Sequence, residues 1–136
     1  MSQEYADMHG WESLAADVAA AYRTLTPDEQ RRAAIVGSNY GEAAAVDFFG
    51  TQYGLPPAVS GHNQYFLWGT HGRDGSVIID INGDCGKDRR LFASSVRARV
   101  HSEKYAMPYE SGIPIMICRG LRVPLATLWP QLKEYI

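Results

Sequence analysis

The sequence is short of positive charge, of cysteine and of long apolar runs, and each shortage excludes a class of protein. Its 136 residues carry a formal net charge of -2, so the basic surface that nucleic-acid binding requires is missing. No apolar run approaches the roughly 18 residues that a membrane-spanning helix needs. The first residues, with Glu4 and Asp7, also lack the basic start and apolar stretch of a signal peptide. We therefore expect no nucleic-acid partner, no membrane span and, for a free-standing chain, a cytoplasmic location.

Sequence motifs for common catalytic centres and cofactors are missing as well. No GxSxG, HExxH or GxxxxGKS/T pattern occurs, and no cluster of histidine and cysteine has the spacing of a metal site. Glu42 follows the turn at 37–41 and would repel a phosphate bound at the start of the next helix. We therefore expect no metal ion, no nucleotide and no other cofactor.

The two cysteines, Cys85 and Cys118, are too few for a disulfide scaffold and too far apart for a CxxC motif. Cys118 lies in an apolar stretch, where a buried unreactive thiol is the simplest interpretation. A single disulfide between the two cysteines is the alternative.

The residues that are present indicate one α/β domain that spans 1–136. Apolar residues make up 46% of the chain and charged residues 21%, which is the usual globular balance. Apolar side chains at helical spacing predict an amphipathic helix over 11–25. The stretch Thr-Pro-Asp-Glu at 26–29 predicts an N-cap, a first-turn proline and two acids at the start of a second, short helix. A last helical pattern covers 125–132.

Five segments have the composition of β-strands, and they predict the fold class. The first two flank a helix that follows Glu42 and ends at Gly54, an order typical of a crossover between parallel strands. Residues 96–101 alternate small apolar with charged residues, which predicts a strand near the sheet edge with one wet face. We therefore predict a three-layer, Rossmann-like fold, with a mostly parallel sheet of about five strands and helices on its faces. The predicted strands are 33–38, 58–59, 77–81, 96–101 and 113–118.

Polar residues gather where the predicted strands end. In open α/β sheets, ligands bind outside the carboxyl ends of the strands, so these residues would share one end of the sheet. Their amide, hydroxyl and charged groups suit a neutral sugar or glycan better than a phosphate. The predicted ligand-binding residues are Asn39, Tyr40, Glu42, Ser60, His62, Asn63 and Arg119.

Two other interpretations of these residues stay open. Strand ends need turns, and asparagine, glycine, serine and aspartate are the residues that turns use, so the clustering could be ordinary turn chemistry. Glu42 and His62 could instead act as a general acid and base, although a lone histidine beside a lone glutamate is more often a structural contact. The sequence assigns no catalytic residue.

Six stretches carry a resemblance to a known family. Together they resemble the soluble C-terminal region of bacterial glycosyltransferase family 39 proteins, which are membrane enzymes related to protein mannosyltransferases and aminoarabinose transferases. The resemblance implies an extracytoplasmic domain of an enzyme that uses lipid-linked sugars. The stretches are SNYGEAAA at 38–45, YGLP at 53–56, SGHNQYFLWG at 60–69, MPYE at 107–110, CRG at 118–120 and LWPQLK at 128–133.

The chain departs from that family because it lacks the multiple spans and membrane-proximal acids on which the transfer chemistry depends. As an excised tail beside a transmembrane glycosyltransferase portion it would be periplasmic, where pairing of Cys85 with Cys118 is favoured. The first-ranked function is a non-catalytic accessory or ligand-binding domain that contacts a sugar or acceptor. The alternatives are a small enzyme that uses Glu42 and His62, and a structural domain that packs on a membrane or protein partner.

Overall fold

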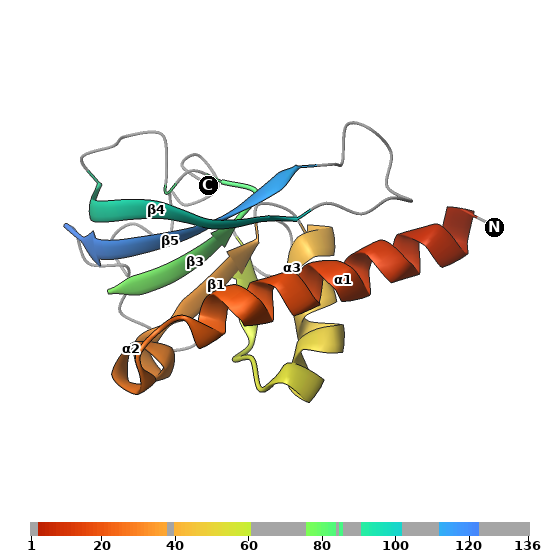
Figure 1. Ribbon diagram of the computed structural model, residues 1–136, viewed down its shortest axis with the longest axis horizontal. Coiled ribbons are helices and arrows are strands. Elements are labelled where there is room, and N and C mark those ends of the chain that lie inside the picture. The colour runs from red at the N-terminus through yellow and green to blue at the C-terminus, as the bar shows by residue number, and fades with distance from the viewer. Residues whose placement is uncertain are drawn as a thin grey trace.

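The computed structural model describes residues 3–37, 40–60, 76–83, 85, 91–101 and 112–122. Helices come mainly from the first half of the chain and strands from the second (Figure 1). The helices are α1 (Gln3–Arg23), α2 (Pro27–Arg32), α3 (Tyr40–Phe49) and the 3-10 helix η1 (Gly50–Tyr53). The strands are β1 (Ala34–Gly37), β2 (Ala58–Ser60), β3 (Val77–Ile81), β4 (Phe92–His101) and β5 (Ile113–Leu121). The predicted helix at 125–132 lies outside the described residues.

The start of α2 follows directly from the local sequence. The Thr26 hydroxyl accepts a hydrogen bond from the Glu29 N–H at 3.1 Å, and the Glu29 carboxylate accepts one from the Thr26 N–H at 3.1 Å. This reciprocal capping box satisfies two backbone donors that the first helical turn leaves unpaired. Pro27 occupies the first helical turn, where a missing N–H costs nothing. The predicted N-cap is therefore confirmed.

The five strands form one mixed sheet in the order β2-β1-β3-β5-β4, with β4 at the upper edge in Figure 1. β1 pairs in parallel with β2 and with β3, and the parallel pairing of β1 with β2 confirms the predicted crossover through α3. β5 runs antiparallel to β3 on one side and to β4 on the other. β5 is therefore the one reversed strand of these five, and β2 and β4 are the outer strands.

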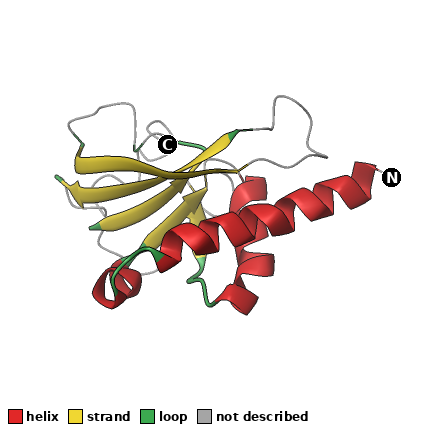
Figure 2. Ribbon diagram, in the orientation of Figure 1, coloured by secondary structure: helices red, strands yellow, loops and turns green. Residues whose placement is uncertain are grey.

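The prediction of a three-layer, mostly parallel, Rossmann-like sheet is wrong. Half of the strand pairings are antiparallel, because β5 enters the sheet between β3 and β4 in the reverse direction. The two longer helices, α1 and α3, pack on the same face of the sheet (Figure 2). In that layer, Leu14 and Val18 of α1 and Val46 of α3 are buried with Ile35 of β1 and Ile79 of β3. The two longer helices thus form one layer, and no described helix covers the other face of the sheet.

The other face of the sheet holds a smaller core with a disulfide at its centre. Cys85, just after β3, is bonded to Cys118 of β5, and both cysteines are buried. The backbone N–H of Cys85 also donates to the buried Asp80 carboxylate at 3.0 Å. A side chain at Gly83 would come within 2.3 Å of that carboxylate, so this turn requires glycine. The disulfide and the turn together fix the end of β3 against the reversed strand.

Reduction of this disulfide should destabilise the protein without any change of sequence. The bond joins residues 33 positions apart. By loop-closure entropy, such a crosslink contributes about 3–4 kcal/mol to the free energy of unfolding. Urea unfolding of the oxidised and reduced wild-type protein would measure the difference, with a Cys85→Ala/Cys118→Ala variant that should match the reduced protein. Equal unfolding midpoints for the oxidised and reduced forms would show that the bond contributes nothing.

Candidate functional site

The carboxyl ends of β1 and β2 hold only part of the predicted ligand-binding set among the described residues. Glu42 lies in the first turn of α3 and is 2% exposed, which removes its carboxyl group from bulk solvent. Tyr40 is the first residue of α3, and Ser60 is the last residue of β2. Three more residues of the predicted set lie outside the described residues: Asn39, His62 and Asn63. The sugar site and the Glu42–His62 pair therefore stay predictions.

Arg119 does not share this end of the sheet, and its inclusion in the predicted site is wrong. Because β5 is reversed, Arg119 pairs in register with Val77, the first residue of β3, and with Ser94 of β4. Glu42, in contrast, follows the carboxyl end of β1, which runs parallel to β3. Arg119 and Glu42 therefore lie at opposite ends of the sheet, and one small ligand cannot contact both.

The polar residue that ends β3 acts as a turn residue. Asn82 has a left-handed backbone with a φ of 62°, and its N–H donates to the Pro114 carbonyl at 2.8 Å. Asparagine is among the few residues that adopt this conformation readily. At this position, ordinary turn chemistry explains the polar residue without a ligand.

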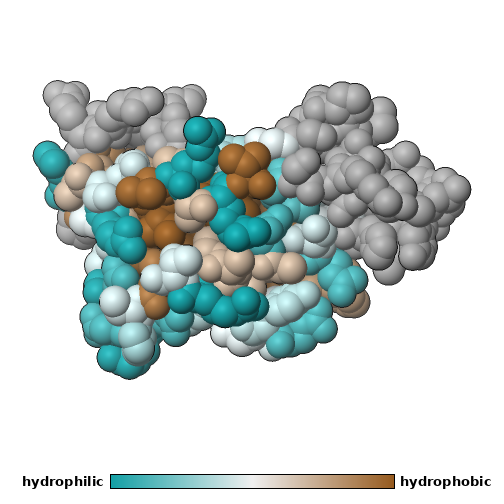
Figure 3. Space-filling model, viewed as in Figure 1, coloured by the Kyte–Doolittle hydropathy of each residue, from teal (hydrophilic) through white to brown (hydrophobic). Residues whose placement is uncertain are grey.

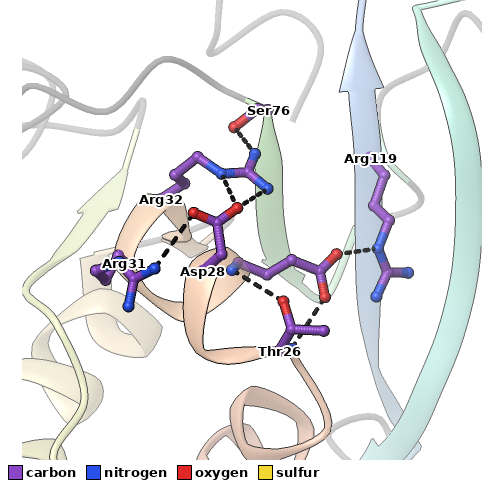
Figure 4. A network of polar contacts seen from close by, with 7 residues as sticks. Thr26, Asp28, Arg31, Arg32, Ser76 and Arg119 are labelled. Carbon is purple, nitrogen blue, oxygen red and sulfur yellow. Dashed lines mark hydrogen bonds and ion pairs between the residues drawn. The ribbon is translucent and has the colours of Figure 1, made fainter.

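Arg119 instead joins β5 to the start of α2 (Figure 4). Its Nε donates to Oε2 of Glu29 at 2.8 Å, while the other Glu29 oxygen accepts from the Thr26 backbone. The Arg119 side chain and the Thr26 backbone, in that order, hold the pKa of Glu29 below its ordinary value of 4.5. The arginine that the sequence pattern assigned to a ligand thus serves a structural ion pair.

A second part of the same network ties α2 to β3. Asp28 accepts hydrogen bonds from Arg31 at 3.4 Å and from Arg32 at 3.0 Å, one turn along the helix. Arg32 also donates to the Ser76 hydroxyl at 2.6 Å, next to the first residue of β3 (Figure 4). These contacts hold α2 beside the amino-terminal ends of β1 and β3, so that this end of the sheet is lined by ion pairs and hydrogen bonds.

A second cluster of polar contacts joins α1 to β4. One oxygen of Asp17 accepts from the Arg99 guanidinium at 2.9 Å, and the other lies 2.8 Å from Nδ1 of His101. His101 is buried, at 3% exposed, although the sequence pattern placed it on the wet face of its strand. Asp17 thus fixes two side chains of the outer strand against the helix layer.

The alternation predicted for β4 is interrupted by a bulge, which carries Val100 to the face opposite Val96. Val96 pairs in register with Ile117 and Val100 with Pro114, with a register shift between Arg97 and Arg99. Since Ile117 and Pro114 are three residues apart on β5, the two valines point to opposite faces of the sheet. Both are exposed, at 49% and 47% respectively. The sequence does not reveal the bulge, because two valines four positions apart give the same pattern whether they lie on one face of the sheet or on two.

The outer edge of β4 carries two of the four exposed large apolar side chains among the described residues; the others are Trp11 of α1 and Phe48 of α3. Among the described residues, β4 pairs with β5 alone, which leaves the backbone groups on its other side without a strand partner. Figure 3 shows hydrophobic surface over β4 and β5, bordered by hydrophilic surface. Exposed β-branched residues on an edge strand invite pairing with another chain, and proteins usually place charge or proline there instead. Arg97 supplies the one charge between the valines that has no ion-pair partner among the described residues.

Comparison with known protein families, with curated proteins and with solved structures finds no match to this chain. The resemblance to the glycosyltransferase family 39 tail therefore stays a prediction. Within the described part of the chain, no helix is long and apolar enough to cross a membrane. In the same residues, no three histidine, cysteine or acidic side chains lie together as a metal site would require.

The Glu29–Arg119 pair should make the stability of the protein depend on acid pH. Because the pKa of Glu29 is lowered in the folded state, its contribution is present above the ordinary value of 4.5 and is lost as pH falls through the lowered pKa. Glu29→Gln keeps the capping-box acceptor but removes the charge, so it should cost less than about 1 kcal/mol at pH 7. Below the lowered pKa the variant and wild type should have equal stability.

Urea unfolding of both proteins at several pH values between neutrality and acid would measure this. Glu12→Gln, at an exposed position of α1 without an ion pair among the described residues, is the matched control for a general loss of surface charge. A stability difference for Glu29→Gln that stayed constant across the acid range would contradict the assignment of the ion pair.

Proposed function

We propose that this chain is a non-catalytic binding domain that recognises another protein through the outer edge of β4. The observation that supports this is the exposure of Val96 and Val100 on an edge strand, on opposite faces of the sheet. Exposed apolar side chains beside backbone groups that no described strand pairs would promote aggregation of a domain that had no partner. A partner strand or surface on this edge would cover both.

Two clusters of charged and polar side chains support binding over catalysis, because their members hold the helices to the sheet. Glu29 pairs with Arg119, and Asp17 pairs with both Arg99 and His101. A catalytic acid or base is expected to stand free in a cleft with a shifted pKa. The pKa of Glu29 is lowered, and the direction follows from its ion pair with Arg119. This retains the accessory-domain interpretation and gives the small-enzyme alternative no support in these residues.

The disulfide supports a place outside the cytoplasm. Cys85 and Cys118 are bonded in the smaller core, and structural disulfides form and persist where the surroundings are oxidising. Such a bond would be reduced or left unformed in most cytosols. We assign the domain to an extracytoplasmic compartment, where it would meet the exposed parts of membrane proteins or secreted chains.

Site-specific photo-crosslinking would test the binding function. A photoreactive benzoylphenylalanine would replace Val96 in the full chain, and in a control it would replace the exposed Gln52 of η1. In the native host, position 96 should give one defined adduct that position 52 does not give. The adduct partner, once purified, should bind the unmodified chain in titration calorimetry. Identical adducts from both positions, or no adduct at 96, would contradict the proposal.

A further inference from the structure

The side chains of β4 differ between the two faces of the sheet, and this difference indicates what kind of partner the edge would accept. On the face that α1 covers lie Val96, Arg99 and His101, opposite odd-numbered residues of β5 such as Ile117. On the disulfide face lie Arg97, opposite Met116, and Val100. A strand laid along this edge would meet an apolar position on each face and one cation.

Arg97 is the arginine of this edge that has no ion-pair partner among the described residues, and its positive charge favours an acidic residue in the partner. Arg99 is held by Asp17 at 2.9 Å, whereas Arg97 is exposed and has no ion pair among the described residues. The chain as a whole carries a net charge of -2, so its overall charge would not attract an acidic segment. The attraction must be local, between Arg97 and a carboxylate placed directly opposite or diagonal to it.

We infer that the partner adds an extended segment to β4 as a further strand, with a carboxylate facing Arg97 and an apolar side chain facing Val96. This inference rests on the proposed binding function and specifies its partner. Main-chain hydrogen bonds to the side of β4 that no described strand pairs would supply affinity, and the two side-chain positions would supply specificity. Neighbouring residues of a strand point to opposite faces, so the apolar and acidic residues of the partner would be adjacent in its sequence.

A second copy of this chain fits the edge less well. Antiparallel pairing about Val96 would set that residue against its own counterpart and Val100 against the buried Phe92. The same pairing would set Arg97 opposite Ser95 and bring two Arg97 side chains to diagonal positions on one face. Like charges at that separation oppose pairing. The bulge between Arg97 and Arg99 also interrupts the straight ladder that two long copies of β4 would need.

Peptide titration followed by the amide shifts of the isotope-labelled full chain would test the inference. The probe is a capped eight-residue peptide in which valine and threonine flank one central glutamate. One matched peptide has lysine in place of glutamate, and another has alternate backbone amides methylated to prevent strand pairing. The glutamate peptide should shift β4 amides and bind about tenfold tighter than the lysine peptide, while the methylated peptide should not bind.

Substitutions in the chain make the test specific to Arg97. Arg97→Glu should reverse the preference, so that the lysine peptide binds tighter than the glutamate peptide. Arg23→Glu, at the exposed end of α1, is the matched charge reversal and should leave the preference unchanged. Equal binding of both peptides, shifts away from β4, or no binding at millimolar concentration would overturn the inference. Self-association of the chain through β4, seen by sedimentation, would overturn it in favour of a second copy.

The two proposals fail in different ways. A defined adduct from position 96 without any effect of the peptides would leave the binding function standing and overturn the strand addition. The absence of any adduct above the control at position 52 would overturn the binding function itself, whatever the peptides do.

Discussion

The reversed direction of β5 is the constraint on which the rest of the structure depends. β5 lies between β3 and β4 and pairs antiparallel with both, and its Cys118 is bonded to Cys85 at the end of β3. On the opposite face, Ile115 and Ile117 are buried under the helix layer. With β5 fixed on both faces, β4 becomes the outer strand, and Arg119 is carried to the end of the sheet where α2 begins. The candidate site and the candidate surface both follow from that single placement.

Residues with strong local signals made part of this fold predictable. Thr26 and Glu29 form the capping box that their spacing indicates, and the segments on either side of α3 form parallel strands. The direction of β5 was not predictable, because an apolar strand such as 113–118 shows the same composition whichever way it runs. Once that direction was assumed, Arg119 was placed with Glu42, when its partner is Glu29. The wrong direction assumed for β5 thus placed Arg119 at the wrong end of the sheet.

The faces of the β4 side chains were also not predictable from the alternation of apolar and polar residues. Simple alternation over 96–101 places the valines inside and His101 outside, but the bulge after Arg97 shifts the register. His101 is then buried against Asp17, and Val100 is exposed on the disulfide face. Val96 precedes the bulge and lies on the helix face, where it is exposed as well. Bulges depend on how two strands fit together, so the sequence of one strand does not reveal them. The exposed valines at the outer edge of β4 were therefore not predictable from a sequence pattern that looks regular.

The claim that the outer side of β4 is open to a partner strand can be tested most directly by amide hydrogen exchange of the protein alone. In an antiparallel edge strand, alternate amides face the neighbouring strand and the others face outward. We predict slow exchange for the β4 amides that bond to β5 and rapid exchange for the alternate amides, on both sides of the bulge. Uniformly slow exchange along Phe92–His101 would mean that the edge is already covered, and would contradict the account.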